Sequence, residues 1–368
     1  MKEGKKCMAK IVIIDTIIEK ELLKKKLEIQ TFFLCEPEAE MPPYQHGTIC
    51  MKILEARTED YEIINIVILE NEQKKVSIER LVEALELCYN FEPDIISMSI
   101  GTTCLKDYQK LSGVIQALNE KGIILIAAPD NSCKITWPAA MDSVIGVTCD
   151  WKERLKPGEI RTLEENIFGL DLVANANLEF KNEPVAFGQS NSYAVPIVVS
   201  LLNTCINKGI RGKERILTEI QNSFGTALAY EQLKYPEKTK LEIFDEPVVL
   251  CQGLHEEEFV PFIEWLWEEH MIQAVGITDD LQTDDFTLLA RNRIGTDIES
   301  FVSTCLQKDL VLFSLNQNQS RLKWDVLIQG EEKQVVIKSA EEEIYVQTKD
   351  DQQWLGTLVN NLVEMLTE

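Results

Sequence analysis

The chain has 368 residues, a length that favours two domains of ordinary size. Its 61 acidic and 37 basic side chains give a formal net charge of −24, which argues against nucleic acid and anionic membrane surfaces as partners. Hydrophobic residues make up 45% and charged residues 27%, so the chain is expected to fold rather than to remain disordered.

The first residues are basic but lead into only four apolar residues, 11–14, before an aspartate. A secretory signal needs about 7–15 apolar residues and a membrane span about 20, so we expect neither and predict a cytoplasmic protein. The ten cysteines include no Cys-x-x-Cys pair. We therefore expect no zinc ribbon, no dithiol redox site and no cofactor, with most thiols buried in a reducing compartment.

In the first half of the chain, apolar runs of strand length alternate with helical patterns. The runs that predict buried strands are Lys10–Ile14, Glu62–Leu69, Ile95–Ser99, Ile123–Ala127 and Ser143–Val147. The segments that predict helices are Ile49–Ala56, Ile78–Asn90, Tyr108–Asn119 and one from about Ser192 to Asn207. Residues 152–184 are less regular and predict loops and short strands. The alternation indicates an α/β fold with a doubly wound, mostly parallel sheet.

A polar segment with a proline, Tyr235–Thr239, follows a predicted helix at Glu214–Phe224 and is the expected domain boundary. We predict one domain over residues 8–234 and a smaller α/β or α+β domain over 240–368. The second is expected to contain strands and helices at Val248–Gln252, Glu256–Glu269, Ile272–Ile277, Thr296–Gln307, Leu310–Ser314, Arg321–Ile328 and Lys333–Ser339, then a short strand and a helix from Gln353.

The aromatic residues of the segment Glu256–Glu269 have two interpretations. Phe259, Phe262, Trp265 and Trp267 have mixed spacing, which is more often found in a core than on a contact surface. The alternative is a surface for substrate docking or for dimerisation into a homo-oligomer, where tryptophan is favoured. We prefer an interaction role to a catalytic one for this domain.

Only three histidines are available for acid–base chemistry: His46, His255 and His270. Neither His255 nor His270 completes a His-Glu-x-x-His motif, so we expect both on solvated helix surfaces and predict no metal site. His46 differs because it directly precedes a predicted helix.

Six segments around His46 and elsewhere resemble, in the same order, motifs of the subtilisin-like serine peptidases. They are Lys10–Thr16 (a strand ending in Asp-Thr), His46-Gly47-Thr48, Ile96–Gly101, Ile126–Asn131, Trp137–Val147 and Ser190–Pro196. The resemblance covers roughly residues 8–210. The first predicted strand begins near residue 10 and leaves little room for a propeptide, so the resemblance is to short intracellular members of the family.

The resemblance implies that Ser192 is the nucleophile, that His46 is the general base and that Asp15 orients the histidine. Elementary chemistry agrees, since a serine hydroxyl needs a base and the base needs a carboxylate to fix its tautomer. Each residue taken singly has a simpler interpretation. Asp15 could cap a turn, Ser192 could cap a helix, and His46 could be an ordinary loop histidine.

The oxyanion-hole asparagine of the family falls on Asp130 in strict register, and Pro129 replaces the preceding glycine. An ionised carboxylate there would repel a tetrahedral intermediate. Three alternatives remain open: Asp130 is protonated, a shift of the loop lets Asn131 donate, or Asn191 supplies the amide. Either asparagine is preferred, because an amide needs no pKa shift.

The resemblance further implies that a substrate backbone pairs with Ser99, Ile100 and Gly101, while Thr136, in place of a glycine, makes the specificity pocket shallower or more polar. We therefore predict an intracellular serine endopeptidase without a metal, acting on a specific peptide or protein such as the leader of a ribosomally made, modified peptide. The alternative is a subtilase-like pseudoenzyme that binds peptides without cutting them. A nucleotide-binding protein is disfavoured, because no glycine-rich phosphate loop follows a strand.

Overall fold

A computed structural model describes residues 8–35, 44–69, 75–132, 134–178, 188–229, 244–254, 256–278, 288–290, 298–314, 323–331, 334–347 and 353–367. Contacts divide the chain into two compact units, Met1–Lys234 and Tyr235–Glu368. The predicted boundary at Tyr235–Thr239 lies outside the described residues, as does His255. Among the helices of the described segments, none combines the length and apolar character that crossing a membrane requires.

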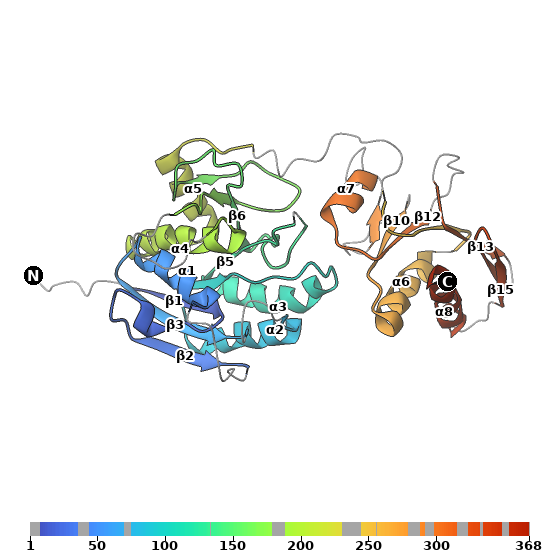
Figure 1. The fold of residues 1–368 in the computed structure, drawn as a ribbon, viewed down its shortest axis with the longest axis horizontal. Helices are drawn as coiled ribbons and strands as arrows, with labels where there is room; N and C mark the ends of the chain where they lie inside the picture. The colour runs from blue at the N-terminus through green and yellow to red at the C-terminus, as the bar shows by residue number, and fades with distance from the viewer. Residues whose placement is uncertain are drawn as a thin grey trace, which may run out of the picture. The chain divides into compact units, whose positions relative to one another are not determined.

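An eight-stranded sheet forms the centre of the first unit, in the order β2-β3-β1-β4-β5-β6-β8-β7 (Figure 1). All neighbouring strands run parallel except β7 and β8. The strands are β1 Ala9–Asp15, β2 Ile29–Phe33, β3 Tyr61–Val67, β4 Ile95–Met98, β5 Ile124–Ala127, β6 Val144–Cys149, β7 Ile160–Thr162 and β8 Leu172–Ala174.

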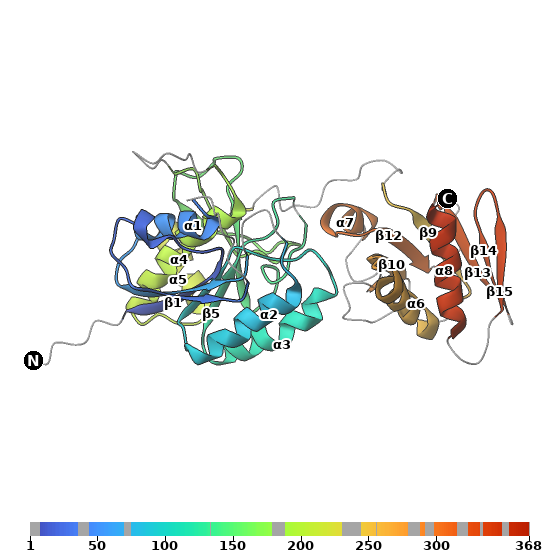
Figure 2. The ribbon, with the colours of Figure 1, turned by 60° about the horizontal axis from the view of Figure 1, so that its bottom comes forward.

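Helices cover both faces of this sheet. Helices α2 and α3 lie side by side on one face, and α1 and α4 lie on the other (Figures 1 and 2). Their bounds are α1 His46–Glu55, α2 Ile78–Leu87, α3 Asp107–Glu120, α4 Asn191–Asn207 and α5 Lys213–Phe224, with short 3-10 turns at Lys20–Leu22 and Cys88–Asn90. The predicted doubly wound, mostly parallel α/β architecture is confirmed.

The predicted strands of this unit are present, with ends that differ by one or two residues. Two predicted elements need correction. Helix α1 begins at His46 itself rather than at Ile49, and the α-helical part of Ile78–Asn90 ends at Leu87. Strand β2 was not predicted, because it lies at the edge of the sheet and only Ile29 of its residues is buried, which leaves no run of buried apolar side chains.

The second unit contains a seven-stranded sheet in the order β11-β10-β12-β9-β13-β14-β15. Strands β13, β14 and β15 pair antiparallel and the other neighbours pair parallel. The elements are β9 Val248–Gln252, α6 Glu256–His270, β10 Ala274–Thr278, β11 Leu288–Ala290, α7 Ile298–Cys305, β12 Leu310–Ser314, β13 Val326–Glu331, β14 Gln334–Lys338, β15 Glu343–Gln347 and α8 Gln353–Thr367.

The core of the second unit lies between its sheet and helices α6 and α8. Phe259 and Phe262 on α6 are fully buried, as the core interpretation of that segment predicted, and Trp265 packs against the same cluster. Trp267 is only partly buried. His270, at the end of α6, bonds Asn360 on α8 at 2.8 Å.

Candidate active site

Hydrogen bonds to two threonine hydroxyls link the end of β1 to the start of α1. Thr16 Oγ1 accepts a hydrogen bond from the Gly47 N–H at 2.8 Å, and Thr48 Oγ1 accepts one from a backbone N–H of the loop after β1. A Cβ atom on Gly47 would lie 2.5 Å from the Thr16 carbonyl oxygen, so only glycine fits there. These contacts give the Asp15-Thr16 and His46-Gly47-Thr48 motifs a local reason: they bring a carboxylate and an imidazole together.

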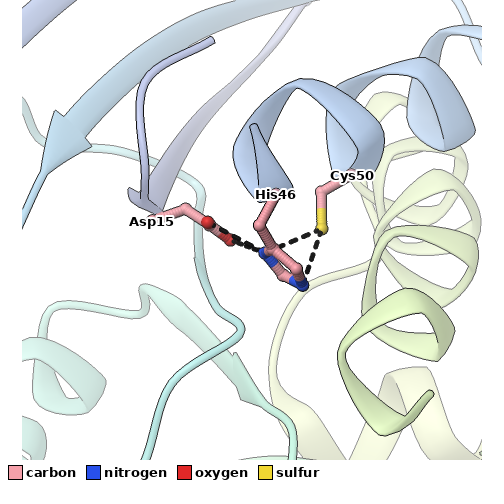
Figure 3. Close-up of side chains that lie close together, drawn as sticks. All are labelled: Asp15, His46 and Cys50. Carbon is pink, nitrogen blue, oxygen red and sulfur yellow. Dashed lines mark hydrogen bonds and ion pairs between the residues drawn. The ribbon is translucent and has the colours of Figure 1, made fainter. Parts of the chain in front are cut away.

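His46 bridges the other two residues that the sequence singled out. Its Nδ1 atom lies 2.9 Å from each carboxylate oxygen of Asp15, and its Nε2 atom lies 2.9 Å from Ser192 Oγ. Figure 3 shows the imidazole extending from α1 toward Asp15 at the end of β1. The structure therefore brings together three side chains from β1, α1 and α4 that are far apart in the sequence.

The environment of His46 favours its charged form. Burial of the imidazole disfavours that charge and lowers its pKa, but attraction to the Asp15 carboxylate, with a smaller contribution from Cys50, outweighs burial. The pKa of His46 is consequently raised well above its ordinary value of 6.5. Asp15, whose side chain is only 2% exposed, accepts from the Thr16 N–H as well, which holds the carboxylate in place for the imidazole.

Two further side chains contact the imidazole of His46. Cys50 Sγ lies 3.7 Å from Nδ1 and 3.8 Å from Ser99 Oγ, and the ring of Tyr193 stacks on the imidazole with centroids 5.3 Å apart. Sequence reasoning missed both. The spacing of four residues between His46 and Cys50 places them on one helix face and could have identified the thiol; no local pattern identifies Tyr193.

Asp15, His46 and Cys50 form a group of described residues that could also hold a metal ion, since their ligand atoms all lie within 4.8 Å of one another. Zinc accepts this mixture of oxygen, nitrogen and sulfur ligands. In the observed arrangement, however, Nδ1 of His46 is already bonded to Asp15. A metal ion would have to replace that bond, so the geometry fits proton transfer better than metal ligation.

Ser192 is the second residue of α4, and the residue that caps this helix is Ser190. The Ser190 side chain accepts from the Ser192 N–H at 3.3 Å, and its Oγ lies 2.8 Å from Ser192 Oγ. The simpler interpretation of Ser192 as the helix cap is therefore wrong. Its half-buried hydroxyl instead lies between His46 and Ser190.

The turn after β5 contains the residues considered for an oxyanion hole. The carboxylate of Asp130 accepts hydrogen bonds from the backbone N–H and the hydroxyl of Ser132, an Asx-type turn that occupies this acceptor. The exposed Asn131 differs, because its Oδ1 accepts from the Asn191 N–H at 3.2 Å. Its amide is thus anchored immediately beside Ser192.

Asn191 has a different environment from the one considered for an oxyanion donor. Its Oδ1 accepts hydrogen bonds from Thr148 Oγ1, the Cys149 N–H and Trp151 Nε1. Its Nδ2 donates to the carbonyl oxygens of the turn after β5, at residues 129 and 130. Because both ends of this amide have partners within the protein, Asn191 joins the turn, β6 and α4 rather than offering a free donor.

The segment Ser99, Ile100 and Gly101 continues from the buried strand β4 and is partly exposed beside Ser192, whose carbonyl oxygen accepts from Ser99 Oγ at 3.4 Å. Thr136 is buried against this segment. Its hydroxyl accepts from the Asp130 N–H and donates to a carbonyl at residue 134, and its methyl group lies 2.6 Å from where a Cβ on Gly101 would be. Thr136 therefore fills the space beside Gly101.

A hydroxyl bonded to an imidazole, whose other nitrogen is bonded to a buried carboxylate, is the arrangement that supports nucleophilic acyl transfer. A family model described as the Subtilase family matches residues 9–361. The chain belongs to the subtilase family. The match to the subtilases extends beyond residues 8–210, where the motifs lie, into the second unit. Subtilases are serine peptidases, so the family agrees with the chemistry of the site.

Two solved structures are similar to this subtilase. One is the prenylagaramide maturation protease PagA, at 17% sequence identity and a TM-score of 0.44, covering 61% of this chain and 94% of that one. The other is a mutant of the protease domain of PatA, at 14% identity and a TM-score of 0.40, covering 56% of this chain and 83% of that one. No curated protein matches the chain significantly.

Proposed function

We propose that this subtilase is a serine endopeptidase in which Ser192 is the nucleophile, His46 the general base and then acid, and Asp15 the residue that orients His46. The observation that carries the proposal is the continuous chain of 2.9 Å contacts from Asp15 through both nitrogens of His46 to Ser192 Oγ. Contacts of this length are within the reach needed for proton transfer.

These contacts support the following path for each proton. With the Nδ1 hydrogen of His46 donated to Asp15, Nε2 accepts the hydroxyl proton of Ser192 while Ser192 Oγ attacks the substrate carbonyl carbon. The imidazolium that forms is stabilised by the buried carboxylate and then gives its proton to the departing amine. A water molecule repeats the sequence on the acyl-enzyme and regenerates the free serine.

The negative charge on the carbonyl oxygen needs hydrogen-bond donors. Ser192 lies in the first turn of α4, where the helix dipole favours negative charge. Of the three side chains considered, Asn131 is the one we propose as the amide donor. Its Oδ1 is fixed on the Asn191 N–H, and Asn191 already donates both of its amide hydrogens elsewhere.

We propose a specific peptide as the substrate. The segment Ser99–Gly101, which continues from β4, lies beside the nucleophile, where a peptide could add as a further strand. Thr136 restricts the adjoining space, which favours a narrow choice of residue near the cut. The substrate to be tested is the leader segment of a ribosomally made, modified precursor peptide, the role implied by the resemblance to short subtilases.

The test is cleavage of short precursor peptides encoded near the gene for this chain, followed by mass spectrometry. A mixed peptide library serves as the unselected comparison. The proposal predicts a single cut in one precursor, lost in Ser192→Ala and in His46→Ala. Cleavage that persists in Ser192→Ala would refute the assignment of the nucleophile, and cleavage of the library at many sites would refute the narrow substrate range.

One observation favours a second candidate, a peptide-binding protein that does not cut. Asp130 places a carboxylate in the turn where the resemblance expects an amide, and Ser190 bonds the N–H of Ser192. Binding by calorimetry separates the candidates when wild type is compared with Ser192→Ala. A peptide-binding protein leaves the peptide intact and binds it with equal affinity as wild type and as Ser192→Ala. An endopeptidase cleaves the peptide in the wild type only.

For the second unit we propose a docking or dimerisation role. Large exposed apolar side chains of this unit include Met271, Trp324 and Tyr345. Sedimentation of the full chain at several concentrations, with and without peptide, tests this role. A monomer throughout, with peptide affinity unchanged by Trp324→Ala and Tyr345→Ala, would contradict it.

A further inference from the structure

Ser190 adds a hydroxyl to the immediate surroundings of the nucleophile. It lies two residues before Ser192. Its Oγ lies 2.8 Å from Ser192 Oγ and accepts from the Ser192 N–H at 3.3 Å. Ser190 therefore contacts both the atom that attacks and a backbone N–H at the N-terminus of α4.

General base catalysis decides which of the two hydroxyls donates. Ser192 has one hydroxyl hydrogen, and its donation to His46 Nε2 is the contact that general base catalysis requires. In the 2.8 Å contact between the two serines, Ser192 Oγ must then accept and Ser190 must donate. Ser190 Oγ accepts the Ser192 N–H through a remaining lone pair.

This hydroxyl adjoins the place where negative charge develops. The oxygen of a reacting carbonyl is bonded to the carbon that Ser192 Oγ attacks, and it takes up the negative charge as the new bond forms. Ser190 Oγ is within hydrogen-bond distance of both groups that border this position, Ser192 Oγ and the Ser192 N–H. Rotation about its Cβ–Oγ bond transfers the hydrogen bond from Ser192 Oγ to the new oxygen without movement of the helix.

Asp130 and Asn191, two of the polar side chains considered for the oxyanion hole, already have hydrogen-bond partners within the protein. The Asp130 carboxylate can only accept while ionised and is bonded to Ser132. Asn191 donates its amide hydrogens to two carbonyl oxygens. Among these side chains and Asn131, the Asn131 amide is left as a donor, so a second side-chain donor has a clear use here.

We propose that Ser190 is a further catalytic residue, whose hydroxyl donates a hydrogen bond to the oxyanion together with the Asn131 amide. This inference rests on the proposed peptidase function. When the bond between Ser192 Oγ and the carbonyl carbon forms, the π electron pair moves to the oxygen and the Ser192 proton moves to His46. The Ser190 proton stays on Ser190 and changes only its acceptor.

The experiment measures labelling of the full chain by a fluorescent fluorophosphonate, which reacts with activated serine hydroxyls and places an oxygen in the same position. Ser190→Ala and Ser190→Gly remove the hydroxyl, whereas Ser190→Thr keeps it. Glycine is tolerated at helix N-caps, so Ser190→Gly tests the hydroxyl even where alanine weakens the helix. Melting temperatures and far-ultraviolet circular dichroism verify that each variant is folded.

We expect the maximal labelling rate to fall about 10²-fold in Ser190→Ala and Ser190→Gly, as for the loss of one oxyanion donor. Ser190→Thr should restore most of that rate, and the half-saturating probe concentration should change little, because the bond forms in the transition state. Rates for both hydroxyl-free variants within about tenfold of wild type, or faster, overturn the inference. Wild type that is not labelled, or labelling that persists in Ser192→Ala, instead refutes the proposed function itself.

Discussion

Replacing Asn191 with alanine tests whether this one side chain holds the turn after β5 against α4, the helix that carries Ser192. The change removes five hydrogen bonds, three accepted by Oδ1 and two donated by Nδ2. Two of the partners, the Thr148 hydroxyl and the Cys149 N–H, lie in fully buried surroundings where water cannot replace the amide. At about 1–3 kcal/mol for each buried group left unpaired, unfolding should become easier by roughly 4 kcal/mol.

Thermal unfolding measures this cost. For a unit of this size, about 2–4 °C per kcal/mol gives a fall in melting temperature of roughly 10 °C. Fluorophosphonate labelling well below that temperature should also slow, because the turn that carries Asn131 loses its two anchors on the Asn191 amide. The matched control is Asn119→Ala in α3, an exposed asparagine whose replacement should shift the melting temperature by no more than about 2 °C.

An Asn191→Ala variant with the same melting temperature and the same labelling rate as wild type would contradict this role of the Asn191 amide. That result would mean that neighbouring groups or water replace the amide, and that the turn is held by other contacts.

Three further predictions concern single residues. In a nuclear magnetic resonance titration, His46 should remain charged above its ordinary pKa of 6.5. Because the neutral imidazole is the base, fluorophosphonate labelling should rise as the pH increases through the raised pKa of His46. In Asp15→Asn, burial is left as the main influence on the imidazole, so the pKa of His46 should fall below 6.5. Gly47→Ala places a Cβ 2.5 Å from the Thr16 carbonyl oxygen, so it should cost about 1–3 kcal/mol in thermal unfolding and abolish labelling. Thr136→Gly removes the side chain beside Gly101. This change should broaden the range of residues that the protein accepts near the cut, as measured with a peptide library.

The Gly47→Ala prediction has a control in the same chain. Gly113→Ala lies in α3 with no atom within 4 Å of the added Cβ, so it should raise rather than lower the melting temperature. A His46 pKa at or below 6.5, a fully labelled Gly47→Ala, or an unchanged cleavage profile for Thr136→Gly would each contradict the corresponding explanation.

The sheet could be predicted from the sequence because its central strands are buried on both faces and appear as unbroken apolar runs. Residues Ile11–Ile14 of β1 and all of β4 are buried, for example, and both strands were predicted to within one residue at each end. The edge strand β2 was missed because only Ile29 of its five residues is buried and polar residues interrupt its apolar pattern.

The proximity of Asp15, His46 and Ser192 could be predicted because each lies in a short motif at the end of a strand or the start of a helix. The hydrogen-bond partners of the polar side chains could not be predicted from the sequence. A sequence identifies Asn191 as an amide but cannot show that its hydrogens are donated to the turn at residues 129 and 130, since that depends on how β5 and α4 pack. The identity of the α4 cap, Ser190 rather than Ser192, likewise depends on backbone geometry one residue before the helix.

We propose that the hydroxyl of Ser192, and no other, is activated by His46 and Asp15. Tandem mass spectrometry of the intact chain after brief reaction with a fluorophosphonate locates the modified residue directly. The account predicts one adduct, on Ser192, whose formation slows sharply in His46→Ala and in Asp15→Asn. An adduct on a different residue, or one that forms on Ser192 at the same rate without the imidazole, would contradict it.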